Sequence, residues 1–265
     1  MKVSIITATF NSASTIRMTI ESVARQTHND IEHLIIDGGS QDNTVEIAKE
    51  YPSVSYIISE PDNGLYEAIN KGIRAAKGDI IGILNSDDFF ASDTIIETIV
   101  NQFSSTETEA IYGDVCYITH DKPFLPIRYY SSKSFNPWKM KFGFIPAHPT
   151  FYMKREKFQE IGLYNESYKI ASDFEFLLRC FCIHKIKYQY IPQTMVYMRI
   201  GGISNKNFAS HKTIFAEHKK ALKENNIYSN SLFLCLRYPI KIFEVVIFRI
   251  TKLFKGKKEQ EIHVD

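Results

Sequence analysis

The first part of the chain alternates short apolar runs with amphipathic stretches. Residues 3–8 are mostly β-branched and apolar, residues 9–12 are mainly polar, and residues 16–24 place apolar side chains three or four positions apart. A short apolar run predicts a buried strand, and a spacing of three to four predicts an amphipathic helix. The predicted repeating unit is therefore strand, loop and helix.

The same unit recurs up to about residue 103. The further expected strands are residues 31–36, 54–58 and 79–84, and the further expected helices are residues 42–50, 66–76 and 93–103. Strands that alternate with helices of this length form parallel sheets with right-handed crossovers. The fold class expected from this pattern is α/β with a mostly parallel sheet.

The second part of the chain is less regular. Further strands are expected at 110–118 and 188–196, an irregular region at 122–141, an extended segment at 145–153, helices at 155–161 and from about 172 to 182, and a flexible polar loop at 199–204. In the later helix, Ser172 or Asp173 is of a residue type that caps a helix N-terminus. His148 lies between two prolines in the extended segment, where a structural role is the alternative to a functional one.

Two neighbouring carboxylates follow the central apolar run. Residues 79–84 are typical of a strand buried on both faces of a parallel sheet, and Asp87 and Asp88 come just after it. Open α/β sheets bind ligands at the carboxyl ends of their strands. Paired carboxylates in such a crevice suit Mg²⁺ or Mn²⁺ carrying a polyphosphate. The alternative is a turn and helix cap, for which Ser86, Asp87 and Asp88 are equally suitable.

Polar loops follow the first, second and fourth expected strands. Because parallel strands end at one edge of the sheet, these loops are expected to converge on one ligand crevice. Gly38 and Gly39 would let backbone amides approach a ligand, and Asp37 offers an acceptor for a base or ribose. The chain has no Gly-x-Gly-x-x-Gly after its first strand and no Gly-Lys-Ser/Thr, which disfavours a dinucleotide site and a phosphate-cradling loop.

Composition narrows the class of protein. The 265 residues carry 32 Lys+Arg against 30 Asp+Glu, a formal charge of +2, which argues against a dedicated nucleic-acid binder. The four cysteines show neither metal-ligand nor disulfide-framework spacing, and the N-terminal apolar run is too short for a signal peptide. We therefore expect a cytoplasmic protein with reduced thiols.

Four short motifs, taken together in order, resemble the family 2 inverting glycosyltransferases. They are Thr-Ala-Thr-Phe-Asn at 7–11, Asp-Gly-Gly-Ser at 37–40, Asn-Ser-Asp-Asp at 85–88 and Ala-Ser-Asp-Phe-Glu at 171–175. The longer string at 59–72 and Gly-Gly-Ile-Ser at 201–204 resemble the bacterial branch that builds colanic acid and other surface polysaccharides. The resemblance covers residues 1–205 and implies a GT-A fold with helices on both faces of the sheet.

The resemblance implies a role for each matching position. Asp173 would be the general base, Asp88 the ligand of Mn²⁺ or Mg²⁺, and His148 a neighbour of the acceptor or metal. The implied contacts to the nucleotide sugar are Thr7, Thr9, Asn11, Asp37, Asp62, Lys71, Ser86 and Asp87, of which Asp87 would contact the ribose or the metal. Many family members have Arg at the position of Ile69, so Lys71 or Asp62 is expected to replace part of its contact to the donor.

The implied reaction transfers a hexosyl or N-acetylhexosaminyl group with inversion. A divalent ion would offset the charge of the departing diphosphate, and Asp173 would take the proton of the acceptor hydroxyl. The resemblance favours a UDP-linked donor and a saccharide or lipid-linked saccharide acceptor. Two alternatives stay open on the sequence: a sugar-phosphate nucleotidyltransferase, and a non-catalytic nucleotide-sugar-binding module.

The residues after 205 are expected to form a helical, basic amphipathic extension. At 100° per residue, residues 240–254 place Ile, Phe, Val and Leu on one side and most Lys on the other. Such a helix can lie in a membrane interface, which predicts a peripheral contact with the cytoplasmic face of the inner membrane. The alternatives are packing against the domain of residues 1–205 or a dimer contact, and a homo-oligomer is left open.

Overall fold

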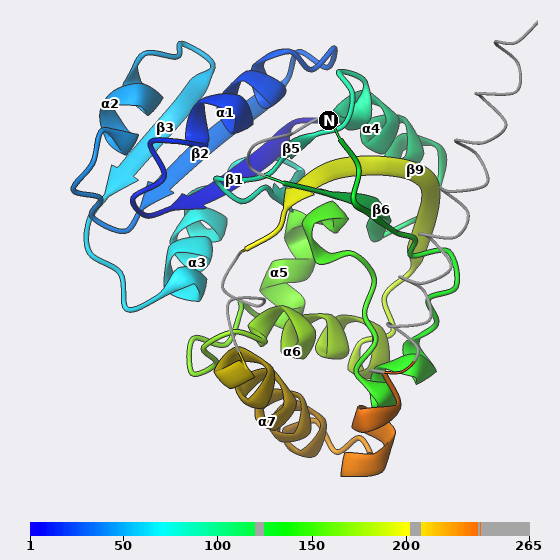
Figure 1. Ribbon diagram of the computed structural model, residues 1–265. Helices are drawn as coiled ribbons and strands as arrows, with labels where there is room; N and C mark the ends of the chain where they lie inside the picture. Colours follow the sequence, from blue (N-terminus) through cyan, green and yellow to red (C-terminus); the bar gives the residue numbers. More distant parts are fainter. Residues whose placement is uncertain (120–124, 202–207, 238, 240–265) are drawn as a thin grey trace, which may run out of the picture.

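A nine-stranded sheet forms the centre of the computed structural model, which describes residues 1–119, 125–201, 208–237 and 239 (Figure 1). The strands are β1 Val3–Thr9, β2 Ile31–Asp37, β3 Val54–Ser59, β4 Ile80–Ile83, β5 Phe89–Phe90, β6 Ala110–Ile118, β7 Arg128–Tyr130, β8 Tyr152–Lys154 and β9 Tyr188–Arg199. Their order is β3-β2-β1-β4-β8-β6-β9-β5, and β7 pairs with β6.

Helices cover both faces of this sheet. The α-helices are α1 Ile16–Ala24, α2 Thr44–Lys49, α3 Leu65–Ala75, α4 Ile95–Ser105, α5 Arg155–Ile161, α6 Ser172–Leu178 and α7 Phe208–Glu224. Two short 3₁₀ helices, η1 Pro137–Phe142 and η2 His148–Thr150, and a π-helix, η3 Arg179–Ile183, complete the described elements. The expected helices up to residue 103 therefore correspond to α1, α2, α3 and α4.

The first half of the sheet is parallel, as the alternating pattern predicts. β1 pairs in parallel with β2 and β4, and β2 pairs in parallel with β3. Alternate side chains of β2 face opposite layers: Ile35 packs with α1 and α2, whereas Leu34 and Ile36 pack with α3. Burial on both faces explains why these strands read as continuous apolar runs.

The second half of the sheet is mixed. β8 lies between β4 and β6 and is antiparallel to both, while β9 is parallel to β6 and antiparallel to β5. The extended segment expected at 145–153 is instead η2 followed by β8, and β9 continues to Arg199. The region expected to be irregular at 122–141 contains β7 and most of η1. β8 pairs with β4 and β6, both distant in sequence, so a local pattern does not indicate it.

The described C-terminal residues pack on the α/β part of the molecule. Ala221 and Leu222 of α7, and Leu234 of a following helix at 231–237, belong to the same core cluster as Phe174 and Leu178 of α6. Figure 1 shows α7 alongside α6. The amphipathic segment predicted at 240–254 lies outside the described residues. Within the residues described, no helix is both long and apolar enough to cross a membrane.

Candidate active site

A cavity of about 540 Å³ opens at the carboxyl ends of β1 and β4. Its lining side chains come from the loops after β1, β2, β3 and β4, from α3, and from the segments around η2, α6 and the end of β9. They include Thr9, Phe10, Ser12, Gly38, Asp62, Tyr66, Ile69, Asn85, Ser86, Asp87, His148, Lys169, Asp173 and Arg199. The convergence expected from parallel topology is therefore present, and the second half of the chain completes the enclosure.

The loops after β1, β2 and β4 are held together by hydrogen bonds. The amide of Asn11 donates to Ser40 Oγ at 2.7 Å, and Asn11 Oδ1 accepts the amide of Gln41 at 2.9 Å. The hydroxyls of Ser12 and Ser86 lie 2.9 Å apart. Asn11 has φ of +48°, a left-handed conformation that Asn tolerates better than most residues. Asn11 thus fixes the loops and is not among the cavity-lining residues.

Two buried oxygens at the cavity have no hydrogen-bond partner within the described residues. They are Thr9 Oγ1 and Asp62 Oδ2, and both residues line the cavity. Asp62 Oδ2 lies near Gly38, where an added Cβ would be only 3.2 Å away. A buried oxygen without a partner costs free energy, so these two atoms are suited to bind polar groups of a ligand.

The two carboxylates after β4 have different surroundings. Asp87 is half-buried and lines the cavity, whereas Asp88 is 1% exposed and does not line it. Asp88 Oδ1 accepts the amide of Arg199 at 3.2 Å, and its Oδ2 accepts Asn85 Nδ2 at 3.1 Å. Burial raises the pKa of Asp88 well above its usual range, and the charge of Asp87 raises it further. Of the two neighbouring carboxylates, therefore, Asp87 is the one that lines the cavity.

Arg199 lines the cavity, which the sequence pattern does not indicate, because residues 199–204 are typical of a flexible polar loop. Its guanidinium donates to the backbone carbonyl of Asp87 and lies 5.3 Å from the ring centre of Phe89. It is 5% exposed and ends β9 beside the Asp pair. Burial lowers the pKa of the Arg199 guanidinium, and the neighbouring Asp87 and Asp88 oppose that effect. The signal in the sequence is a basic residue just before the Gly-Gly-Ile-Ser motif at 201–204.

Asp173 and His148 lie next to each other in the lining of the cavity. His148 Nδ1 lies 3.3 Å from Asp173 Oδ2, and both side chains remain partly exposed. Asp173 Oδ1 accepts the amide of Phe174 at 2.8 Å. The expected helix-capping role does not apply. α6 begins at Ser172, and its N-cap residue is Ala171, which makes no side-chain capping hydrogen bond. Asp173 is thus available to act on a ligand in the cavity.

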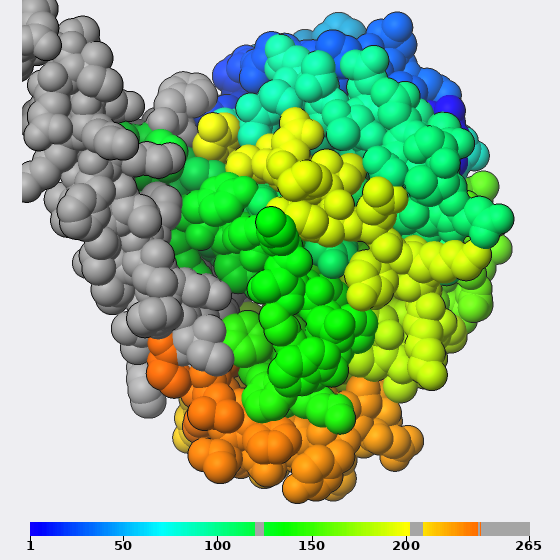
Figure 2. All heavy atoms as spheres, turned by 90° about the vertical axis from the view of Figure 1, so that its right-hand side faces the viewer, coloured from blue at the N-terminus to red at the C-terminus, as the bar shows by residue number. Residues whose placement is uncertain are grey.

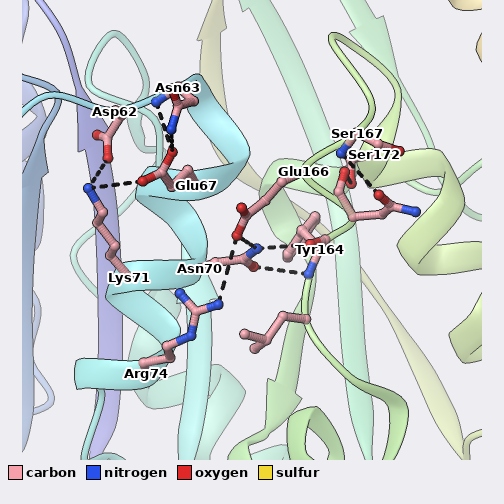
Figure 3. A network of polar contacts seen from close by, with 12 residues as sticks. Asp62, Asn63, Glu67, Asn70, Lys71, Arg74, Tyr164, Glu166, Ser167 and Ser172 are labelled. Carbon is pink, nitrogen blue, oxygen red and sulfur yellow. Dashed lines mark hydrogen bonds and ion pairs between the residues drawn. The ribbon is translucent and has the colours of Figure 1, made fainter.

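The segment that leads into α6 is anchored from two sides. On one side Asn70 of α3 donates to the carbonyl of Tyr164 at 2.8 Å and accepts its amide at 3.0 Å (Figure 3). On the other side, Glu217 of α7 accepts the amides of the three residues before Ser172 at 2.7 to 3.0 Å. These contacts fix the backbone that positions Asp173.

Lys71 does not reach the cavity, contrary to the expectation from the sequence. Its ammonium pairs with Asp62 and with Glu67 at 3.4 Å (Figure 3). It also pairs with Glu60 at 2.8 Å. These neighbours raise the pKa of Lys71, chiefly through the hydrogen bond to Asp62. Lys71 therefore acts on the cavity only indirectly, by holding Asp62. Ile69, at the position where the family often has Arg, does line the cavity.

Thr7 and Asp37, both expected at the nucleoside, are also turned away from the cavity. Thr7 is fully buried, and its hydroxyl lies 3.0 Å from His33 Nε2. Asp37 Oδ2 accepts the amides of Gly39 and Ser40 at 3.1 and 3.0 Å and the hydroxyl of Ser59 at 2.7 Å. Asp37 thus shapes the turn after β2. Short polar residues at a strand end serve turns as readily as ligands, which the sequence pattern does not distinguish.

The cavity-lining side chains fit a divalent ion that is bound together with a diphosphate. In the described ranges no group of three or more His, Cys, Asp and Glu side chains could hold a metal by itself. Ions such as Mg²⁺ at nucleotide sites, however, need only one or two carboxylates and complete their shell with phosphates and water. Asp87, half-buried at the cavity edge, supplies such a carboxylate.

Known proteins resemble this chain in sequence and in structure. The family model described as Glycosyl transferase family 2 matches residues 4–172. A PGL/p-HBAD biosynthesis glycosyltransferase of Mycobacterium tuberculosis is 29% identical over 208 residues, which cover 76% of this chain and 78% of that protein.

Two solved structures share the architecture. The first is S. aureus TarS 1–349 in complex with UDP-GlcNAc, with a TM-score of 0.66 and 15% identity over 88% of this chain and 70% of that chain. The second is the mannosyltransferase PcManGT from Pyrobaculum calidifontis in complex with GDP-Man and Mn²⁺, with a TM-score of 0.60 and 16% identity over 83% and 64%. At such identities the likeness concerns the fold.

Proposed function

The chain belongs to glycosyl transferase family 2 and has the GT-A fold, and from this premise we propose that it is an inverting glycosyltransferase that uses a nucleotide-diphosphate sugar. The observation that carries the proposal is the single cavity shared by the loops after β1 and β4 and by Asp173. A donor held at the loops would present its sugar toward the carboxylate. Family membership favours this reading over a nucleotidyltransferase.

In the proposed donor site, Thr9 and Asp62 bind the nucleoside and Asp87 lies at the diphosphate. The buried oxygens of Thr9 and Asp62 have no partner in the described residues, and binding a polar ligand would remove that cost. Asp87 would hold Mn²⁺ or Mg²⁺, which when bound offsets the charge of the departing diphosphate. Arg199 keeps the backbone of Asp87 in place.

In the proposed reaction, the acceptor hydroxyl attacks the sugar C1 from the face opposite to the diphosphate. The C1–phosphate bond breaks, the new C1–oxygen bond forms, and the hydroxyl proton passes to Asp173, while the nucleoside diphosphate departs with the bonding electrons. A positioned carboxylate contributes about 10²- to 10⁴-fold to such a proton transfer. His148, 3.3 Å from Asp173 Oδ2, orients the carboxylate toward the acceptor.

The donor and acceptor are proposed by class. TarS and PcManGT were solved with UDP-GlcNAc and with GDP-Man, which supports a nucleotide-sugar donor, and we propose a UDP-linked hexose or N-acetylhexosamine. The acceptor is proposed to be a saccharide or lipid-linked saccharide of a surface glycan. The M. tuberculosis relative, named for PGL/p-HBAD biosynthesis, supports an acceptor of this class.

Nucleotide binding tests the proposal directly. The full chain is titrated calorimetrically with UDP, GDP, dTDP and CMP, with and without Mn²⁺, and Asp87→Ala is titrated in parallel. One nucleoside diphosphate should bind in a Mn²⁺-dependent manner, and Asp87→Ala should lose the dependence. A chain that binds none of the four in either condition has no donor site in this cavity. Sugar transfer from the matching donor then separates an enzyme from a binding module.

A further inference from the structure

A second surface, away from the cavity, combines exposed apolar side chains with lysines. It is formed by η1, by the turn after η3, and by the segment that ends in the helix at 231–237. We call it the aromatic–lysine face. Its residues are Trp138, Lys139, Lys141, Phe142, Lys185, Tyr228, Leu232, Phe233 and Leu236. Figure 2 shows the last described residues, in orange, at one end of the molecule beside the green part of the chain.

Large apolar side chains project from this face. Tyr228 is 73% exposed, Leu232 67% and Trp138 56%. In the helix at 231–237, Leu234 is buried in the core, whereas Leu232 and Leu236 point outward, and Leu236 is 42% exposed. Residues four apart share one side of a helix, so the outward side of this helix is apolar. Exposed apolar clusters of this kind mark interaction surfaces.

The aromatic side chains of the face form one continuous cluster. Ring centres are 5.5 Å apart for Trp138 and Phe142, 4.9 Å for Phe142 and Phe233, and 6.4 Å for Phe233 and Tyr228. Ser229 Oγ donates to the carbonyl of Lys141 at 2.6 Å and joins η1 to the C-terminal segment. A hollow of about 450 Å³ on the same face is lined by residues that include Trp138, Lys141 and Lys185. Aromatic and basic groups are therefore interleaved.

The charge of the face has one sign. Residues 131–144, 181–188 and 225–237 contain six Lys and Arg and no Asp or Glu, whereas the whole chain is nearly balanced, with 32 Lys+Arg and 30 Asp+Glu. Lys187 pairs with Glu107 at 2.7 Å, and Arg237 contacts His218 at 2.9 Å, so these two contribute less. Lys133 precedes η1, so three lysines of the face remain, Lys139, Lys141 and Lys185, and a partner that complements them is anionic.

We propose that the aromatic–lysine face docks on an anionic phospholipid bilayer. Trp and Tyr prefer the interface between headgroups and acyl chains, and leucines that protrude from a helix can be buried among the chains. Each lysine near anionic headgroups contributes attraction that salt weakens. A nucleic acid would match the lysines but leave Leu232 and Leu236 in water. The bilayer is the anionic partner that accommodates both features.

Docking on this face would hold the cavity at a defined distance from the bilayer surface. Asp173 lies near the start of α6, and α6 continues through η3 to the turn that forms part of the face. At about 1.5 Å per helical residue, Ser172 to Ile183 spans about 15–18 Å. The docking itself is independent of the proposed function. Its use, bringing a lipid-linked acceptor near Asp173, rests on that function.

Vesicle sedimentation of the full chain tests the proposal. Vesicles of phosphatidylcholine alone are compared with vesicles that contain about one third phosphatidylglycerol, at low and high salt. Wild type should pellet with the anionic vesicles and be released by salt. Two paired variants, Leu232→Ser/Leu236→Ser and Lys141→Glu/Lys185→Glu, should each lower the bound fraction about tenfold.

Matched controls come from the opposite part of the molecule. Tyr56→Ser removes a side chain that is 52% exposed on β3, and Lys49→Glu reverses an exposed charge on α2. Both should sediment as wild type does, and thermal melting should show that all variants fold. Equal binding of the leucine pair and wild type would overturn the proposal, as would no preference for anionic vesicles. The proposal would also be overturned if wild type is a dimer that does not bind vesicles and the leucine-pair variant is a monomer.

Discussion

His148 Nδ1 lies 3.3 Å from Asp173 Oδ2, although the two residues are 25 positions apart and belong to η2 and α6. An imidazole N–H that donates to this oxygen fixes one face of the carboxylate and leaves the other toward the cavity. His148→Gln should lower kcat about tenfold, the loss of one hydrogen bond to a charged group. Steady-state kinetics with the matching donor measures this, and an unchanged kcat would limit His148 to a structural role.

Replacement of the proposed base should separate chemistry from donor binding. Asp173→Asn keeps the size of the side chain but removes its basicity, so kcat should fall about 10²- to 10⁴-fold. The dissociation constant of the donor nucleotide should stay within about twofold of wild type, because Asp173 does not lie at the nucleoside loops. Glu175→Gln is a control in the same helix, since Glu175 pairs with Arg179 at 2.8 Å away from the cavity lining. A loss of nucleotide binding in Asp173→Asn would place this residue in the donor site.

The two carboxylates after β4 should respond differently to substitution. Asp87→Asn should abolish Mn²⁺-dependent nucleotide binding while thermal stability stays near wild type. Asp88→Asn should retain that binding and lower the free energy of unfolding by about 1–3 kcal/mol, because its new amide would face an N–H donor. Calorimetric titration and thermal melting distinguish the two effects. If Asp88→Asn loses the Mn²⁺-dependent binding and Asp87→Asn retains it, Asp88 is the metal ligand.

Lys71 should influence stability more than diphosphate recognition. Lys71→Gln leaves the carboxylates of Glu60, Asp62 and Glu67 without their shared cation, so the melting temperature should fall. If Lys71 does not touch the diphosphate, the ratio of UDP to uridine affinities should stay constant. Competition against a fluorescent nucleotide measures this ratio, and a selective loss for UDP would contradict the observed geometry. Asp62→Asn should lower the affinities for UDP and for uridine by the same factor.

His33 should make the fold sensitive to mild acid. Burial lowers the pKa of His33 to about 3, while the unfolded chain keeps a value near 6.5. The unfolded state therefore binds more protons below about pH 6.5, and this contribution to stability is lost as pH falls toward 3. Between pH 7 and 5.5 the loss from this residue should be about 1 kcal/mol. Denaturant unfolding of wild type and His33→Gln at both values tests this, and equal pH dependence would refute it.

The local sequence determined the elements of the first half and the edge at which they end. Continuous apolar runs become β1, β2 and β4 because strands covered on both faces need apolar side chains at every position. Parallel pairing then brings the following loops to one edge, where Thr9, Asp62, Ser86 and Asp87 line the cavity. Three of the four motifs that resemble glycosyl transferase family 2 lie in these loops, and the order of the motifs along the chain is visible without a structure.

Tertiary structure alone decided which polar side chains at that edge face the cavity. Asp37 ends β2 and Asp62 follows β3. Asp37 accepts hydrogen bonds from its own turn and from Ser59 of β3, while Asp62 keeps one oxygen without a partner in the described residues. Likewise, Asp87 and Asp88 are adjacent in sequence but differ in burial. Hydrogen bonds from Asn85 and Arg199 settle the orientation of Asp88, and Arg199 comes from a strand 111 positions away. A linear pattern reports residue type and spacing, whereas the direction of a side chain depends on partners that only the folded chain brings near.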